Sequence, residues 1–236
     1  MTCDILVRSY YKDLGWLGHC LRSIERWCTG FRRVIVVVPE STRPRLVTHD
    51  LAYDELIVCA DQRDDYLGQQ VTKLSADTLT DADVICHIDS DCVFRRPTTP
   101  DDLHDGGRLR QHLMPYEELP ANIPWKRITE EFLGRPVEFE FMRRQPQAFP
   151  RWIYPELRAH ARARHGRELA DYVLAQPHRG FSEFNALGAY AYYFHHDEFA
   201  WVDLTGPGVP DPLCACFWSW GGIGPAVESE IEALLA

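Results

Sequence analysis

A run of apolar residues, Val34–Val38, constrains the fold more than any other stretch of this sequence. Every residue in it is β-branched, and Pro39 ends it. A strand without polar alternation is covered on both faces, which is typical of parallel sheets. Three more segments read as strands: Asp4–Tyr10, Leu56–Cys59 and the apolar run that starts at Val84 and ends at Asp89 and Asp91. Two segments between them, Leu14–Cys28 and Gln69–Leu79, show helical spacing of apolar residues. This order predicts a doubly wound, mostly parallel α/β sheet.

Two carboxylates separated by one residue, Asp89 and Asp91, close the fourth predicted strand. Open α/β sheets bind ligands at the carboxyl ends of their strands. Two aspartates there can hold a hard divalent cation through oxygen ligands. The alternative interpretation is a solvated turn that leaves the strand.

The amino-acid composition limits the classes of binding partner and of enzyme that the chain could represent. The 236-residue chain carries a formal charge of -10, which argues against nucleic acid or an anionic membrane as the main partner. No apolar run is long enough to span a bilayer, and no signal-peptide pattern opens the chain, so we expect a cytoplasmic protein. The eight cysteines match no disulfide framework and are expected to be reduced. Gly-rich dinucleotide and P-loop motifs are absent from the sequence, which argues against those classes of enzyme.

The C-terminal half has a different amino-acid composition. Residues 97–155 are rich in Pro, Gly, charge and aromatic side chains, and are expected to form short helices and long loops of a binding lobe. Four later segments read as regular elements: a helix over 156–174, a helix over 181–190 that Ser182 can cap, a strand over 201–204 and a helix over 226–236. We expect a single domain.

The sequence resembles the nucleotide-diphospho-sugar glycosyltransferases of the GT-A type. The resemblance depends on Arg8-Ser9-Tyr10 after the first strand, the Val34–Pro39 strand, the Gln69-Gln70-x-x-Lys73 helix and Ile88-Asp89-Ser90-Asp91. It is especially close to a bacterial set of uncharacterised glycosyltransferase-like proteins that also carry a Ser-Glu-Phe-Asn segment, here Ser182–Asn185. It implies a GT-A like (Rossmann-like) fold with helices on both faces of the sheet. Residues 1–96 would bind the nucleotide sugar, and residues 97–236 would bind the acceptor.

The resemblance also implies roles for the donor half. Asp91, with Asp89, would bind Mn²⁺ or Mg²⁺ at the diphosphate of a nucleotide-diphosphate sugar. The cation would stabilise the charge that develops on the leaving nucleoside diphosphate. The other candidate donor contacts are Arg8, Ser9, Tyr10, Gln70, Lys73 and Ser90. Lys73 attracts attention because the chain has only three lysines.

In the acceptor half, Glu183 is the candidate general base of an inverting transferase, at the start of an apolar helix where burial would raise its pKa. A retaining mechanism would instead make Glu183 or Asn185 an acceptor-binding or stabilising residue. The remaining candidate contacts with a small-molecule or soluble acceptor are Trp218, Ser219 and Trp220, as a lid or sugar-stacking platform. His195 or His196 is a candidate third metal ligand.

Two other functions fit part of the pattern. Asp89-Ser90-Asp91-Cys92-Val93 matches the Asp-x-Asp-x-Val motif of haloacid-dehalogenase-like phosphatases, in which Asp89 would be the nucleophile. Those enzymes carry the motif on their first strand, whereas here three predicted strands precede it. A non-catalytic sugar- or nucleotide-binding module is the second alternative.

Overall fold

A mostly parallel central sheet organises the molecule. The computed structural model describes residues 1–46, 51–120 and 125–236, and within these the sheet has the strand order β3-β2-β1-β4-β9. The strands are β1 (Cys3–Arg8), β2 (Val34–Pro39), β3 (Glu55–Cys59), β4 (Val84–Asp89) and β9 (Gln147–Pro150). The first four are parallel, and β9 pairs antiparallel with β4. The predicted α/β fold with a mostly parallel sheet is therefore confirmed.

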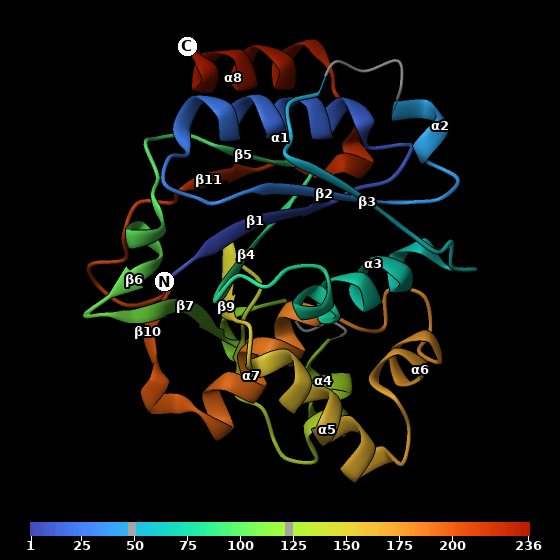
Figure 1. The fold of residues 1–236 in the computed structure, drawn as a ribbon. Coiled ribbons are helices and arrows are strands. Elements are labelled where there is room, and N and C mark those ends of the chain that lie inside the picture. The colour runs from blue at the N-terminus through green and yellow to red at the C-terminus, as the bar shows by residue number, and fades with distance from the viewer. Residues whose placement is uncertain (47–50, 121–124) are drawn as a thin grey trace.

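Burial explains why the apolar runs form the centre of this sheet. Every residue of β1 is buried, as are Ile35–Pro39 of β2. Parallel strands bury both faces only when helices cover them. In Figure 1, α1 and α8 lie on one side of the sheet, and α3, α5 and α7 lie on the other. The helices are α1 (Leu14–Trp27), α2 (Arg43–Leu46), α3 (Asp65–Leu74), α4 (Trp125–Leu133), α5 (Ile153–His165), α6 (Leu169–Leu174), α7 (Glu183–Phe194) and α8 (Pro225–Leu235).

Helix boundaries follow local capping chemistry. α3 begins before the predicted start at Gln69 because the Asp64 carboxylate accepts the backbone N–H of Tyr66 at 3.0 Å. The helix predicted over 156–174 is wrong as one element. Gly166 adopts a left-handed conformation with φ 62°, which ends α5 and leaves α6 as a separate helix.

The expectation of short helices and long loops over 97–155 is only partly met. This stretch contains β7, an eight-residue strand whose Leu109, Gln111 and Leu113 are buried on alternate positions. Strands β10 and β6 flank β7, and β8 pairs with its end. These elements are β6 (His104–Asp105), β7 (Arg108–Pro115), β8 (Phe139–Glu140) and β10 (Phe199–Asp203). One hydrophobic core includes residues of this layer and of the central sheet.

A two-stranded antiparallel pair, β5 (Cys92–Phe94) with β11 (Cys214–Cys216), directly follows the Asp89–Asp91 turn. A small apolar cluster of Trp16, Val93 and Ile231 joins this pair to α1 and α8. Among the helices of the described residues, none has the length and apolar character needed to cross a membrane.

Candidate functional site

The candidate site lies at the carboxyl ends of β1 and β4. Arg8 and Asp89 are paired residues in the register of these strands, so both strands end at the same edge. The buried Arg8 guanidinium forms a two-pronged ion pair with Asp65 of α3, in which Nη1 lies 3.1 Å from Oδ2. Nη1 also donates to the Ser9 carbonyl at 2.9 Å. Arg8 therefore ties the end of β1 to α3.

A buried lysine links the three elements that meet here. The Lys73 ammonium of α3 donates to Glu183 Oε1 at 2.7 Å and also to Asp89 Oδ1. Its side chain is 3% exposed and that of Glu183 is 4% exposed, which leaves little water to screen the pair. The ammonium also lies 4.6 Å from the centroid of the Phe184 ring. Lys73 thus holds the end of β4 against the start of α7.

The protonation of this cluster follows from burial and charge. Burial lowers the pKa of Lys73, but Asp89 and Glu183 more than offset this effect and raise it. Burial raises the pKa of Glu183, and the Lys73 ammonium opposes that rise. Lys73 is therefore a firmly charged ammonium beside a carboxyl group whose charge depends on it.

Two glutamines complete the cluster. The Gln70 side-chain oxygen accepts the backbone N–H of Glu183 at 2.6 Å, which orients the first turn of α7. Gln145 donates from Nε2 to Asp89 Oδ2 at 3.2 Å. Both oxygens of Asp89 are thus engaged, one by Lys73 and one by Gln145.

Asp91 has a different environment. Its Oδ2 accepts the backbone N–H of Ser219 at 3.0 Å, and its carbonyl accepts that of Phe217 at 2.8 Å. The Phe217 ring stacks on the buried Trp16 at 5.8 Å between centroids, which anchors this segment. Burial, followed by the charge of Asp89, raises the pKa of Asp91 to about 6.

Further acidic groups surround Asp91. Burial, and then the charge of Asp65, raises the pKa of Asp13 to about 6. Burial raises the pKa of Tyr10, and the charges of Asp13 and Asp65 add to this rise. The strand edge therefore carries a concentration of negative charge, which a bound cation would relieve.

The donor set at this edge suits a hard divalent ion held together with a ligand. No group of three or more His, Cys, Asp or Glu side chains in residues 1–46, 51–120 and 125–236 converges into a cage. Mg²⁺ sites of the substrate-phosphate type use only one or two carboxylates and complete the shell with phosphate oxygens and water. Asp91 matches that requirement in ligand type, whereas both oxygens of Asp89 already accept hydrogen bonds, from Lys73 and Gln145.

The predicted site residues fall into three groups in the structure. Asp89, Lys73, Gln70 and Glu183 are joined by direct hydrogen bonds. Ser9 and Ser90 are buried at the strand ends, and the Ser9 hydroxyl has no hydrogen-bond partner in the described structure. The third group comprises the aromatic residues near Asp91.

These aromatic residues are exposed. Trp218 is 65% and Trp220 is 77% exposed, and Ser219 between them binds Asp91. Simple core packing therefore does not account for these two rings. They lie on a short 3₁₀ turn beside the acidic edge.

Two predicted residues, Asn185 and His195, make their contacts within the protein. Asn185 is fully buried, and its amide accepts the N–H of Phe141 at 2.9 Å and donates to Ser182 Oγ at 3.2 Å. Both ends of the Asn185 amide are thus hydrogen-bonded within the protein. His195 lies at the opposite end of α7 from Glu183 and pairs with Glu156 at 2.8 Å. A twelve-residue helix spans roughly 18 Å, so a metal-ligand role beside Asp91 is wrong for this histidine.

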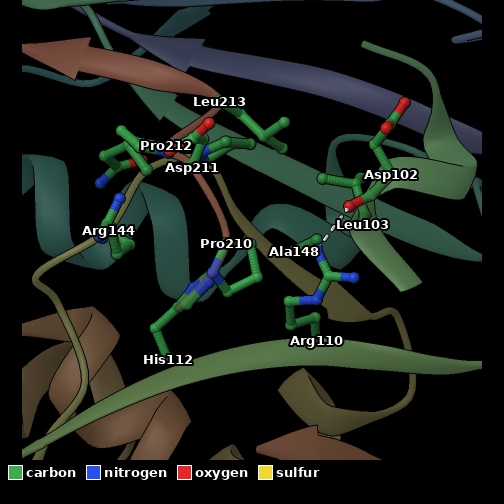
Figure 2. Close-up of a pocket in the computed structure, with 12 residues that line it drawn as sticks. Asp102, Leu103, Arg110, His112, Arg144, Ala148, Pro210, Asp211, Pro212 and Leu213 are labelled. Atoms are coloured by element: carbon green, nitrogen blue, oxygen red, sulfur yellow. Dashed lines mark hydrogen bonds between the residues drawn. The ribbon is translucent and has the colours of Figure 1, made fainter. Parts of the chain in front are cut away.

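Sequence reasoning missed Asp13, Asp65 and Gln145. Asp65 was recognisable only as a first-turn acid of α3, and Gln145 lies between an arginine and a proline with no local pattern. Gln145 also lines a small cavity of about 20 Å³ beside the site. Figure 2 shows Arg110, His112 and Arg144 around this cavity. Burial, followed by the charges of Arg144 and Arg110, lowers the pKa of His112 to about 4.

A larger cavity lies elsewhere. Its volume is about 630 Å³, and its lining includes Met1, Asp83 and Val84 at the amino ends of β1 and β4. It is therefore at the opposite edge of the sheet from Asp89.

The fold and the site define an α/β protein with acidic side chains at the carboxyl ends of its parallel strands. Residues 19–196 match DUF6492, described as a family of unknown function, and the match covers more than half of the chain. The protein belongs to this family. The matched region contains Lys73, Asp89, Asp91 and Glu183, whereas Arg8–Tyr10 and Trp218–Trp220 lie outside it. No curated protein matches the chain.

Proposed function

We propose that this protein is a metal-dependent glycosyltransferase of the GT-A type. It would move a sugar from a nucleotide-diphosphate donor to a small-molecule or soluble acceptor. The observation that carries the proposal is the pair Asp89 and Asp91 at the carboxyl end of β4, where Lys73 and Gln145 hold Asp89 and Ser219 holds Asp91.

In this proposal Asp91 is the principal metal ligand, with Asp89 beside it. Bound Mn²⁺ or Mg²⁺ would neutralise the charge that develops on the departing nucleoside diphosphate. The raised pKa of Asp91 supports the assignment, because an adjacent cation favours the charged carboxylate that burial and Asp89 disfavour. Ser9 and Tyr10 lie at the end of the neighbouring strand, where the unpartnered Ser9 hydroxyl is available to the nucleoside.

Glu183 takes a positioning role in this mechanism. Lys73 donates to Glu183 Oε1, so the Glu183 carboxylate is a poor acceptor for a proton from the substrate while that ion pair persists. It holds the ammonium that in turn fixes Asp89. A direct general-base role would require the Lys73–Glu183 contact to open, and a pH–rate profile of Glu183→Gln separates the two roles. Loss of the acidic limb, in which the rate rises as the pH increases through the pKa of the base, would indicate a base, whereas a uniform decrease in rate would indicate positioning.

The exposed tryptophans are proposed as the sugar-facing surface. Aromatic side chains have large apolar faces and pack against other apolar surfaces, including one face of a pyranose ring. Trp218 and Trp220 flank Ser219, whose N–H binds Asp91, so a sugar beside the diphosphate would lie within reach of this turn. Trp220→Ala is expected to weaken sugar-nucleotide binding more than binding of the matching nucleoside diphosphate.

The phosphatase alternative receives less support. A nucleophilic aspartate needs a free oxygen that faces the phosphorus atom. In Asp89, Lys73 occupies one carboxylate oxygen and Gln145 the other.

The decisive experiment is a thermal-shift screen of nucleoside diphosphates and sugar nucleotides with and without Mn²⁺. Wild type is compared with Asp91→Ala and with the control Asp105→Ala, an exposed carboxylate on β6. A ligand at 100 times its Kd stabilises the folded state by about 2.7 kcal/mol. We expect a Mn²⁺-dependent response in the wild type and in Asp105→Ala, but not in Asp91→Ala.

Two outcomes would count against the proposal. In the first, no nucleotide shifts the wild type, and an assay with generic phosphate esters then tests the phosphatase alternative. In the second, Asp91→Ala keeps its full Mn²⁺-dependent response. Where a nucleotide sugar does bind, its turnover is measured with an added acceptor. An enzyme releases the nucleoside diphosphate, whereas a binding module does not.

A further inference from the structure

Two cysteines face each other across the β5–β11 pair. Cys92 of β5 and Cys216 of β11 are directly opposed residues in the antiparallel register. All eight cysteines of the chain are free thiols in the structure. Neither cysteine takes part in the proposed glycosyl transfer.

The hydrogen bonds of this pair define the geometry of the two thiols. Phe217 donates to the carbonyl of Asp91 at 2.8 Å, and Arg95 donates to that of Leu213 at 3.0 Å. Opposed residues in antiparallel strands alternate between hydrogen-bonded and non-hydrogen-bonded pairs. Since Asp91–Phe217 is a hydrogen-bonded pair, the adjacent Cys92–Cys216 pair is a non-hydrogen-bonded one.

This position favours a covalent link. The Cα atoms of a non-hydrogen-bonded pair lie about 4.5 Å apart, and their side chains are on the same face. Disulfides form across Cα separations of about 4.4 to 6.8 Å. Cys214, two residues along the same strand, lies farther from Cys216, at about 6.8 Å.

The two thiols differ in access to solvent. Cys216 is exposed, whereas Cys92 is 2% exposed. A small oxidant therefore reaches Cys216 first, and Cys92 is the partner that resolves the adduct. This arrangement of one accessible and one shielded thiol is suited to reversible oxidation.

We propose that Cys92 and Cys216 are a redox-sensitive modification site that closes into a cross-strand disulfide. The thiolate of Cys216 attacks a low-molecular-weight disulfide such as oxidised glutathione and releases one thiol. The sulfur of Cys92 then attacks the Cys216 sulfur of the mixed disulfide and releases the second thiol. Two electrons and two protons pass from the protein thiols to the oxidant, which leaves as two thiols.

The link has a structural consequence at the acidic edge. Phe217, which directly follows Cys216, and Ser219 both donate hydrogen bonds to Asp91, which directly precedes Cys92. A disulfide between Cys92 and Cys216 would therefore tether the start of segment 217–219 beside Asp91. Its formation does not depend on the proposed transferase activity.

The test is non-reducing peptide mapping of the full-length protein after equilibration with reduced and oxidised glutathione. We expect peptides containing Cys92 and Cys216 to be linked with the loss of two hydrogen atoms, and Cys216 to lose its alkylation by a thiol reagent until a reductant is added. In Cys92→Ser we expect glutathione to remain attached to Cys216. The matched control Cys59→Ser, on the half-buried strand β3, should form the link as the wild type does.

Two results would overturn the assignment. One is a link from Cys216 to another cysteine, such as Cys214 or Cys20. The other is a wild-type protein that accumulates only a glutathione adduct at Cys216. Both are read from the wild type alone, so the test does not depend on whether a variant folds.

Discussion

Replacement of Lys73 by methionine tests the buried charge cluster most directly. The side chains are of similar length, so the change removes the ammonium while keeping much of the apolar stem. Lys73 is bonded to Glu183 and Asp89, and both the ammonium and the Glu183 carboxylate are almost fully buried. The variant leaves these acids without their cation.

Removing one partner of a buried ion pair costs about 3 to 5 kcal/mol, because an uncompensated charge stays in the interior. We expect Lys73→Met to lower the free energy of unfolding by about this amount at pH 8. The chain supplies a matched control in Lys12, an exposed lysine on a loop. Lys12→Met should change stability by no more than about 0.5 kcal/mol.

The pH dependence of the stability of Lys73→Met provides a second, independent test of the buried charge cluster. Without Lys73, burial and the charge of Asp89 would raise the pKa of Glu183 further above its ordinary value of 4.5. A carboxyl group with a raised folded-state pKa stabilises the protein below its unfolded pKa, and this contribution is lost as the pH rises through the folded value. The deficit of Lys73→Met relative to wild type should therefore shrink as the pH falls toward 4.5.

Urea unfolding followed by circular dichroism at several pH values measures both effects. Adding Glu183→Gln to Lys73→Met should recover part of the lost stability at pH 8, since one stranded charge is removed. A cost below about 1 kcal/mol, or a deficit that does not change with pH, would refute the reasoning that Lys73 compensates buried carboxylates.

Three other predictions concern separate features. Asp91→Asn removes a carboxyl group whose pKa is raised from 3.8 to about 6, and this raised pKa makes the wild type lose stability as the pH rises from 4 to 7. The loss is up to about 3 kcal/mol, and the variant should lack it. Urea unfolding across that range measures the difference, and parallel curves for the two proteins would contradict it. Ser182→Ala removes the cap of α7 and should cost about 1 kcal/mol in urea unfolding; no loss would show that the cap is dispensable. Gly188→Ala should destabilise by about 1 to 3 kcal/mol or more, because a new Cβ would lie 2.4 Å from the Phe141 Cβ. Gly224→Ala, where a Cβ meets open space, is its thermal-melting control, and equal melting temperatures would exclude the clash.

The sequence by itself was sufficient for the four parallel strands of the central sheet and for the position of the acidic pair, but not for the antiparallel edge strand β9. Continuous apolar runs in β1, β2 and β4 indicate that these strands are buried on both faces. Each run can be identified from the residues of its own strand alone. The start of α7 could also be predicted from local sequence, because the Ser182 hydroxyl accepts the backbone N–H of Asn185, only three residues along the chain. Asp89 and Asp91 were identifiable because they directly follow such a strand.

Only the tertiary structure decided how these residues are used. The Lys73–Glu183 pair joins positions 110 residues apart, and the Asp91–Ser219 hydrogen bond joins positions 128 residues apart. Lys73 had no sequence feature that distinguished a solvated cation from a buried one, and Gln145 had no motif at all. Local periodicity and capping report which face of an element is apolar. Which distant side chains meet at the end of a strand is determined by how the elements pack, and spacing along the chain does not carry that information.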